Sequence, residues 1–220
     1  MKKGKNLVML LLVCAIALRG AVMVSAAAVA RTGTEADAIR KLKIIAVNAN
    51  VDVQLAGNGQ YSYSYDRSKF TVTTAKGGQT FKIKVKAKPG AANGWENRVI
   101  VYIPKQAYTS ITGVAKKSGM SLPAVNANIN VINSAGAVSI SLPSNYSKTV
   151  NYTGVSGSGS LAMNGNTDFA VDAEFSVCAV AVPSRWPAYS NGSSSYSYTS
   201  GSGAAKINIK LKGCSFAFVK

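Results

Sequence analysis

Side chains that commonly catalyse hydrolysis or bind metals are scarce in this 220-residue sequence. It contains no histidine, which excludes a Ser–His–acid triad, a histidine-ligated zinc site and an imidazole general base. Of the eight carboxylates, only Asp168, Asp172 and Glu174 cluster. On one strand face they would suit a calcium ion or acid–base cleavage of a glycan, or they simply balance nearby lysines in solvent. We predict no catalytic residues, no metal site and no cofactor.

Two alternating stripes of side chains are the best candidates for binding. Alternate residues of a strand share one face of its sheet, so each stripe would present one row of similar groups. Aromatic rings could stack on sugars while lysines receive acidic groups, although alternating tyrosines also occur in ordinary cross-strand packing. The candidate binding residues are Tyr61, Tyr63, Tyr65, Lys82, Lys84 and Lys86.

The elements that carry these stripes are short runs in which apolar and polar residues alternate. A period of two predicts strands with one dry face and one wet face. Gly, Asn or Ser interrupts the runs, and no helical period is visible, so we expect an all-β protein. The clearest runs are Leu42–Val47, Val51–Leu55, Phe81–Val85, Val99–Ile103, Ile129–Val131, Val138–Leu142 and Ile207–Leu211.

The first residues have the three parts of an export signal. A basic leader precedes the apolar stretch Leu7–Leu18, and small residues follow at Val24–Ala26. We therefore expect a signal peptide at residues 1–26, a flexible lead-in at 27–41 and a single domain at 42–220. An uncleaved anchor that runs from Leu7 to Ala30 is the alternative. The protein would then be extracellular or associated with the cell envelope, and membrane-anchored if the signal is retained.

Two cysteines, Cys178 and Cys214, remain after such a cleavage. An even number of cysteines in an exported chain permits one disulfide. Both residues also lie in apolar, strand-like surroundings, which suit buried free thiols equally well. The sequence leaves both states open.

Small residues recur at nearly regular intervals after Pro104, beginning at Ser118–Gly119, Ser134–Gly136 and Ser156–Gly157. A small-residue turn about every 20 residues predicts a solenoid, in which strand–turn units stack and backbones pass closely at each corner. The stretch Pro183–Gly203, rich in Ser, Tyr and Gly, is expected to form an extruded loop.

These features resemble the bacterial putative-adhesin β-strand-repeat family, a family of unknown function related to the head GIN adhesin-like domains. The likeness rests on LKIIAVNANVDVQLA, NRVIVYIP and NINVINSAGAVSISLP, and it covers about residues 42–212. It implies an exported, right-handed, parallel β-helix-like solenoid, with no catalytic or binding residues to carry over. An antiparallel β-sandwich is the alternative fold.

The formal net charge of +17 indicates attraction to polyanions and anionic surfaces. The same lysines could instead serve solubility, because charged side chains protect sheet edges from aggregation. We expect a non-enzymatic, adhesin-like envelope protein that binds through an exposed sheet face. Candidate partners are an anionic cell-wall polymer, an acidic glycan or an envelope protein. Neither nucleic acid nor a small-molecule substrate is expected. A polysaccharide-active β-helix enzyme is the alternative function.

Overall fold

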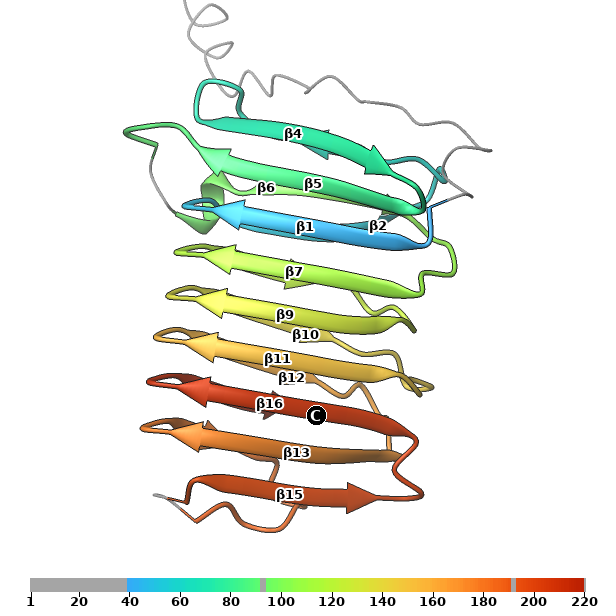
Figure 1. Ribbon diagram of the computed structural model, residues 1–220, viewed down its shortest axis with the longest axis vertical. Helices are drawn as coiled ribbons and strands as arrows, with labels where there is room; N and C mark the ends of the chain where they lie inside the picture. Colours follow the sequence, from blue (N-terminus) through green and yellow to red (C-terminus); the bar gives the residue numbers. More distant parts are fainter. Residues whose placement is uncertain (1–38, 92–93, 191–192, 220) are drawn as a thin grey trace, which may run out of the picture.

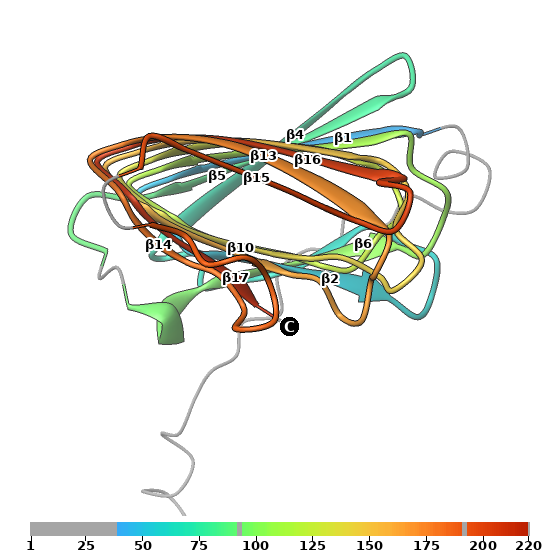
Figure 2. The same ribbon diagram turned by 90° about the horizontal axis from the view of Figure 1, so that it is seen from below.

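The computed structural model describes residues 39–91, 94–190 and 193–219. The expected signal peptide, residues 1–26, lies outside the described residues, as does most of the expected lead-in. Two mixed β-sheets form the described chain, together with one turn of 3₁₀ helix at Trp95–Asn97. The sheets face each other like the layers of a sandwich, with the apolar core between them (Figures 1 and 2).

The larger sheet, here called sheet A, has nine strands. In spatial order they are β15 (Ser195–Ser200), β13 (Phe169–Ser176), β16 (Ala205–Lys212), β11 (Thr149–Val155), β9 (Asn128–Ser134), β7 (Ser110–Lys116), β1 (Lys41–Val47), β5 (Thr80–Ala87) and β4 (Phe70–Gly77). All neighbouring pairs are parallel except the outermost two, β15 with β13 and β4 with β5.

The smaller sheet, sheet B, has eight strands. In spatial order they are β14 (Ala179–Ala181), β17 (Ser215–Val219), β12 (Ser158–Ala162), β10 (Ala137–Ser141), β8 (Gly119–Leu122), β2 (Val51–Ala56), β6 (Val99–Pro104) and β3 (Ser62–Ser64). Only the outermost pair β3 with β6 is antiparallel. The two layers agree with the alternative fold, an antiparallel β-sandwich, but the pairing does not, because antiparallel pairs occur only at the outer edges of the sheets.

From β7 to β14 the chain passes alternately between the sheets, so each sheet A strand is followed by a sheet B strand. Alternation of apolar and polar residues explains this arrangement, because each strand buries only one face. In β16, for example, Ile207, Ile209 and Leu211 are buried while the lysines between and beyond them are exposed. Burial of one such side chain contributes roughly 1.5–3 kcal/mol.

Strand order departs from chain order at both ends of the stack (Figure 1). The unit formed by β1 and β2 lies between the later strands β5 and β6 and the central strands β7 and β8. At the opposite end, β16 lies between β11 and β13, and β17 lies between β12 and β14. The first and last strands of the described chain are therefore interior members of their sheets.

A left-handed backbone conformation ends six strands of sheet A and turns the chain toward sheet B. The residues with positive φ are Asn48, Lys117, Ala135, Ser156, Val177 and Gly213. Except for Val177, their N–H groups donate to the end of the neighbouring strand; that of Ala135, for example, donates to the Val155 carbonyl at 2.8 Å. At the next position, a Cβ on Gly136 or Gly157 would collide with the backbone of the adjacent turn. These corners explain the spacing of small residues.

Aromatic clusters close both ends of the core. At one end the Tyr61 ring packs 4.7 Å from that of Phe81. At the other, Trp186 is 5% exposed and its ring lies 5.0 Å from Phe169 and 5.1 Å from Phe218. The expectation of an extruded loop at 183–203 is therefore wrong. This segment folds back over the core and supplies strand β15, because its aromatic side chains gain more from burial than from solvent.

Candidate functional site: a lysine face on sheet A

Five exposed lysines occupy adjacent strands at one end of sheet A, and we call this surface the lysine face. Parallel β1 and β5 are in register, so Lys43 lies opposite Lys82. Strands lie about 4.8 Å apart and alternate residues of a strand about 6.7 Å apart, so the ammonium groups form a planar array. The lysine face consists of Lys41, Lys43, Lys82, Lys84 and Lys86.

The array lacks internal compensation of charge. In the described residues, the ion pairs are Lys69 with Asp66, Arg98 with Asp52, and Lys210 with Glu174. None involves the lysine face. Like charges directly opposite each other on neighbouring strands are destabilising, by roughly 1 kcal/mol at about 4 Å in water. An anionic ligand would relieve this repulsion.

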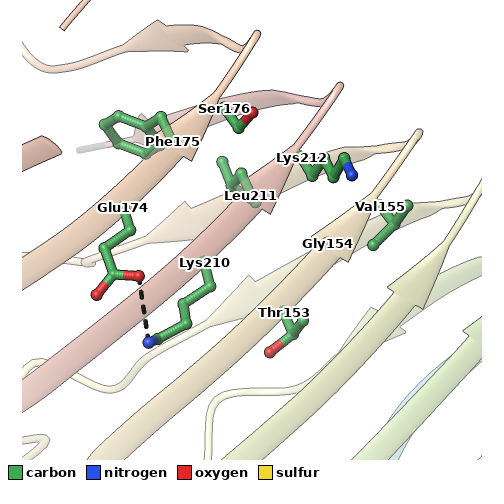
Figure 3. A pocket seen from close by; sticks show the side chains of 9 residues that line it. All are labelled: Thr153, Gly154, Val155, Glu174, Phe175, Ser176, Lys210, Leu211 and Lys212. Atoms are coloured by element: carbon green, nitrogen blue, oxygen red, sulfur yellow. Dashed lines mark ion pairs between the residues drawn. The ribbon is translucent and has the colours of Figure 1, made fainter. Parts of the chain in front are cut away.

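The other end of the same face provides a contrast. A shallow hollow of about 260 Å³ lies over β11, β16 and β13 (Figure 3). There the Lys210 ammonium lies 3.2 Å from the Glu174 carboxylate, and both side chains remain about two-thirds exposed. This lysine is neutralised by its neighbour, whereas those on β1 and β5 are not. The hollow is therefore a weaker site for an anion.

Between these two ends, asparagine side chains form a ladder on the outer face. The Asn151 amide donates to the Asn130 Oδ1 at 2.9 Å, and the Asn208 amide donates to the Asn151 Oδ1 at 2.9 Å. On the next outward row, Ile132 is 50% exposed. The lysine face thus continues into a surface of amide and aliphatic groups without carboxylates on β7, β9 or β11.

The tyrosine stripe does not join the lysine face, which corrects one expectation. Tyr61 is fully buried and Tyr63 is 5% exposed, while Tyr65 is half-buried. The Tyr61 hydroxyl lies 3.1 Å from that of Tyr108, and burial raises the pKa of both phenols. Tyr61 and Tyr63 have no ring face available to a sugar, because the end of the core needs their apolar area. Of the six candidate residues, the three lysines remain exposed.

The three clustered carboxylates do not converge. Asp168 precedes β13 and accepts hydrogen bonds from the Ser202 hydroxyl and the Ala204 N–H at 3.0 Å, which lower its pKa. Asp172 and Glu174 lie on the outer face of β13, where Glu174 pairs with Lys210. Among the described residues, no three His, Cys, Asp or Glu side chains form a metal-binding group.

The two cysteines occupy equivalent corner positions after the neighbouring strands β13 and β16. Both are free thiols in the structure; Cys214 is buried and Cys178 partly exposed. The Cys214 N–H donates to the Cys178 sulfur at 3.4 Å, and each thiol donates to a carbonyl two residues earlier. A disulfide between them stays a prediction, which the mass of the alkylated protein would check.

Sequence reasoning missed Lys41 and Lys43. Their alternation with Leu42 and Ile44 was a visible signal, because it repeats the pattern of Lys82 and Lys84. Nothing in the local sequence indicates that β1 pairs with β5. Between the end of β1 at Val47 and the start of β5 at Thr80 there are 32 residues, which include the strands β2, β3 and β4. Three of the five lysines, on β5, were therefore predicted from the sequence, and the two on β1 were not.

No known protein family matches the chain, and no curated protein matches it either. Among solved structures, the chain is similar to a putative cell adhesion protein from Clostridium sporogenes. The TM-score is 0.54 at 15% identity, over 85% of this chain and 95% of that one. This likeness shows a shared fold. In the described part of the chain, no helix has the length and apolar character needed to cross a bilayer.

Proposed function

We propose that this chain is a non-enzymatic, adhesin-like protein of the cell envelope that binds an anionic polymer through the lysine face. The partner is a linear polyanion such as an anionic wall polymer or an acidic glycan. The observation that carries the proposal is an array of five exposed ammonium groups on two neighbouring strands, none of which forms an ion pair within the part of the chain that the structure describes. Export of the protein and its location at the envelope are parts of the proposal.

The chemistry of the array fits a repeating polymer better than a single small anion. Lysine is a flexible point charge, and the lysine face holds no arginine that could grip one carboxylate or phosphate at two points. Five charges spread over two strands would each contribute a modest attraction. Their sum would be strongly screened by salt, because the Debye length at physiological ionic strength is only about 8 Å.

The proposal includes a coiled architecture for the domain, as a right-handed β-helix-like solenoid. Alternation of strands between sheets, parallel pairing in the interior and a repeated left-handed corner support it. The fold shared with the Clostridium sporogenes protein, itself described as a putative cell adhesion protein, supports the adhesin-like part of the proposal.

No observation favours the alternative of a glycan-cleaving enzyme. Hydrolysis of a glycosidic bond ordinarily uses two carboxyl groups that flank the bond. Here the Asp168 carboxylate is held by its own loop and the Glu174 carboxylate by Lys210. Lack of catalytic activity therefore remains part of the proposed function.

A binding titration with two matched variants tests the proposal. Lys82, Lys84 and Lys86 are changed together to glutamine, and the control changes in the same way three exposed lysines that are not part of the lysine face, Lys105, Lys117 and Lys148. Both variants lose three charges, so a general effect of net charge would weaken both equally. Polyglutamate and polygalacturonate serve as probes at low and moderate salt.

We expect the affinity of the lysine-face variant for the polyanion to fall at least tenfold and to depend much less on salt concentration. The control variant should keep most of its affinity and most of the dependence of that affinity on salt. A loss of about 1.4 kcal/mol corresponds to tenfold. Equal losses in the two variants would show that net charge, rather than this array, attracts the polymer. Absence of binding by the unchanged protein at low salt would refute the proposed function.

A further inference from the structure

The two long edges of sheet A lie at opposite ends of the stack, and in the described residues Lys76 is the only charged side chain on either edge strand. Strand β4 forms one edge and β15 the other (Figure 1). Proteins normally block such edges with charged side chains, proline or a bulge. Apart from Lys76 near the end of β4, the two strands contain only Phe, Val, Thr, Ser, Tyr, Ala and Gly. In contrast, the edge strands of sheet B have only three residues each.

The backbone groups that face outward at each edge follow from the ladder. The Lys88 N–H donates to the Lys69 carbonyl at 2.8 Å, which fixes the phase of pairing between β4 and β5. In an antiparallel pair, bonded and non-bonded positions alternate. Val72 and Thr74 therefore direct their N–H and C=O groups away from β5, toward the open edge.

The same reasoning applies at the opposite end. The Phe175 N–H donates to the Ser194 carbonyl at 2.7 Å, which fixes the phase of β15 against β13. Ser197 and Thr199 therefore direct their backbone groups toward the open edge, whereas the N–H and C=O of Ser195 bond to the Ser193 hydroxyl. Each end of the molecule presents a row of donors and acceptors that only another extended strand satisfies well.

The directions of the two strands are compatible. Strand β4 is antiparallel to β5, β15 is antiparallel to β13, and all strands from β5 to β13 in sheet A are parallel. It follows that β4 and β15 run in the same direction. The two strands are inclined to each other when seen along the stack (Figure 2). A second copy that is displaced along the stack and rotated about it would bring its β4 beside β15 as a parallel pair, which continues the sheet.

Charge favours this arrangement over one that joins two identical ends. Beside β4, strand β5 presents Lys82, Lys84 and Lys86; beside β15, strand β13 presents Asp172 and Glu174 on the same outer face. Asp172 lies opposite Ser197 of β15 and forms no ion pair in the described residues, whereas Glu174 is shared with Lys210. The lysines of β5 and the carboxylates of β13 in the next copy would lie three strand spacings apart, about 14 Å. Over this distance two β4 ends repel each other and β4 against β15 attract each other at low salt, and salt screens both effects.

We propose that copies of this protein associate head to tail through β4 of one copy and β15 of the next. Such a contact uses two different surfaces, so it leaves one edge free at each end and generates a filament unless the rotation between copies closes a ring. The association does not depend on the proposed polymer binding, because the lysine face remains on the outer surface of sheet A.

Two edge-blocking variants test the inference. Proline replaces Thr74 in β4 or Ser197 in β15, which removes one outward N–H and places a ring against the incoming strand. Thr74→Ala and Ser197→Ala keep the N–H groups and serve as controls. Sedimentation velocity is measured over a wide range of protein concentration at low salt, without any polyanion, and circular dichroism checks that each variant is folded.

We expect the unchanged protein and both alanine controls to sediment faster as concentration rises. Each proline variant alone should remain at the 22.9 kDa monomer or its processed form. An equimolar mixture of the two proline variants should give dimers only, because one variant keeps a free β15 and the other a free β4. Moderate salt should weaken the association.

Two results would overturn the inference. One is a monomer at every concentration of the unchanged protein. The other is dimerisation of Ser197→Pro alone, which would show that two β4 edges pair with each other. If a proline variant does not fold, amide hydrogen exchange of the unchanged protein decides: Val72, Thr74, Ser197 and Thr199 must gain protection between low and high protein concentration.

Discussion

Val177 at the corner after β13 offers a sharp test of the structure, because it combines a left-handed backbone with a β-branched side chain. Its φ is +53° and its side chain is 92% exposed. Branching at Cβ makes this conformation especially unfavourable for valine. The side chain makes little contact with the rest of the protein, so its removal sacrifices almost no packing. Val177→Gly is therefore expected to stabilise the fold.

The magnitude follows from two opposing effects. Relief of the left-handed conformation is worth roughly 1–2 kcal/mol. Glycine has more freedom in the unfolded chain, which costs about 0.5–1 kcal/mol. The difference predicts a gain of about 0.5–1 kcal/mol in the free energy of unfolding. Because the Val177 side chain is already exposed in the folded protein, its removal hardly alters the surface exposed on unfolding, so the slope of the unfolding free energy against denaturant should not change.

Chemical denaturation of three variants provides the measurement. Gly213 is the equivalent corner residue after β16, with φ +59°, and the nearest atom to an added Cβ is the Ser156 Oγ at 3.9 Å. Gly213→Val should therefore lose stability for backbone reasons alone, by about the amount that Val177→Gly gains. Val155→Gly makes the same chemical change within strand β11 and should destabilise.

The sign of the effect decides the outcome. If Val177→Gly lowers the denaturation midpoint as Val155→Gly does, the backbone of Val177 is not left-handed in solution. The repeated corner after the strands of sheet A would then be misassigned at this position, and the packing of β13 beside β16 would need revision.

Three further predictions concern the core and its buried polar groups. Trp186→Ala removes an aromatic side chain that closes one end of the core and should cost about 3–5 kcal/mol in chemical denaturation, whereas Trp95→Ala, at a ring that is 45% exposed, should cost much less. Asn133→Ala deletes a buried amide that donates to the Ser158 carbonyl at 2.9 Å and the Gly136 carbonyl at 3.1 Å, and should lower the free energy of unfolding by about 2–4 kcal/mol. The exposed control Asn151→Ala should lower it by less than about 1 kcal/mol. Similar losses in the two variants would contradict the burial of Asn133. Burial raises the pKa of Tyr152 to about 12. The stability that the neutral phenol contributes is therefore complete below the unfolded pKa of about 10 and is lost as the pH rises toward 12. If the stability of Tyr152→Phe falls equally steeply over this pH range, Tyr152 is not the group responsible.

Strands were the most predictable part of this protein. The alternation of Lys206–Lys212 or Lys82–Lys86 with apolar residues specifies one buried face without any knowledge of partners. Three of the small-residue steps, at Gly119, Gly136 and Gly157, lie at corners in the structure. A larger side chain would collide with the backbone of the adjacent turn at Gly136 and Gly157, and with the side chains of Asn50 and Trp95 at Gly119. The corners at Asn48 and Val177 were missed, since neither residue type signals a close approach.

The candidate site was predictable only in part. The exposure of Lys82, Lys84 and Lys86 follows from local alternation, but the burial of Tyr61 and Tyr63 does not. Tyrosines that alternate with serines fit an exposed face equally well. The two tyrosines are buried because they cover one end of the core, and this tertiary contact leaves no signal in the local sequence. The same reason explains Trp186, whose segment resembled a loop and instead covers the core.

The interior position of the first and last described strands bears on how the molecule can be assembled. Strand β16 separates β11 from β13, although it is made after both. During synthesis β13 therefore cannot pair permanently with β11, the strand of sheet A made before it. Its final partner β16 is made some 30 residues later.

A protein built this way cannot be shortened or lengthened by whole units at its termini, as most repeat proteins can. Removal of β16 and β17 would open a gap inside both sheets and leave β13 to β15 without support. We expect the chain to fold as one cooperative unit rather than unit by unit, so partial chains should be rapidly degraded and intact ones resistant to fraying from either terminus.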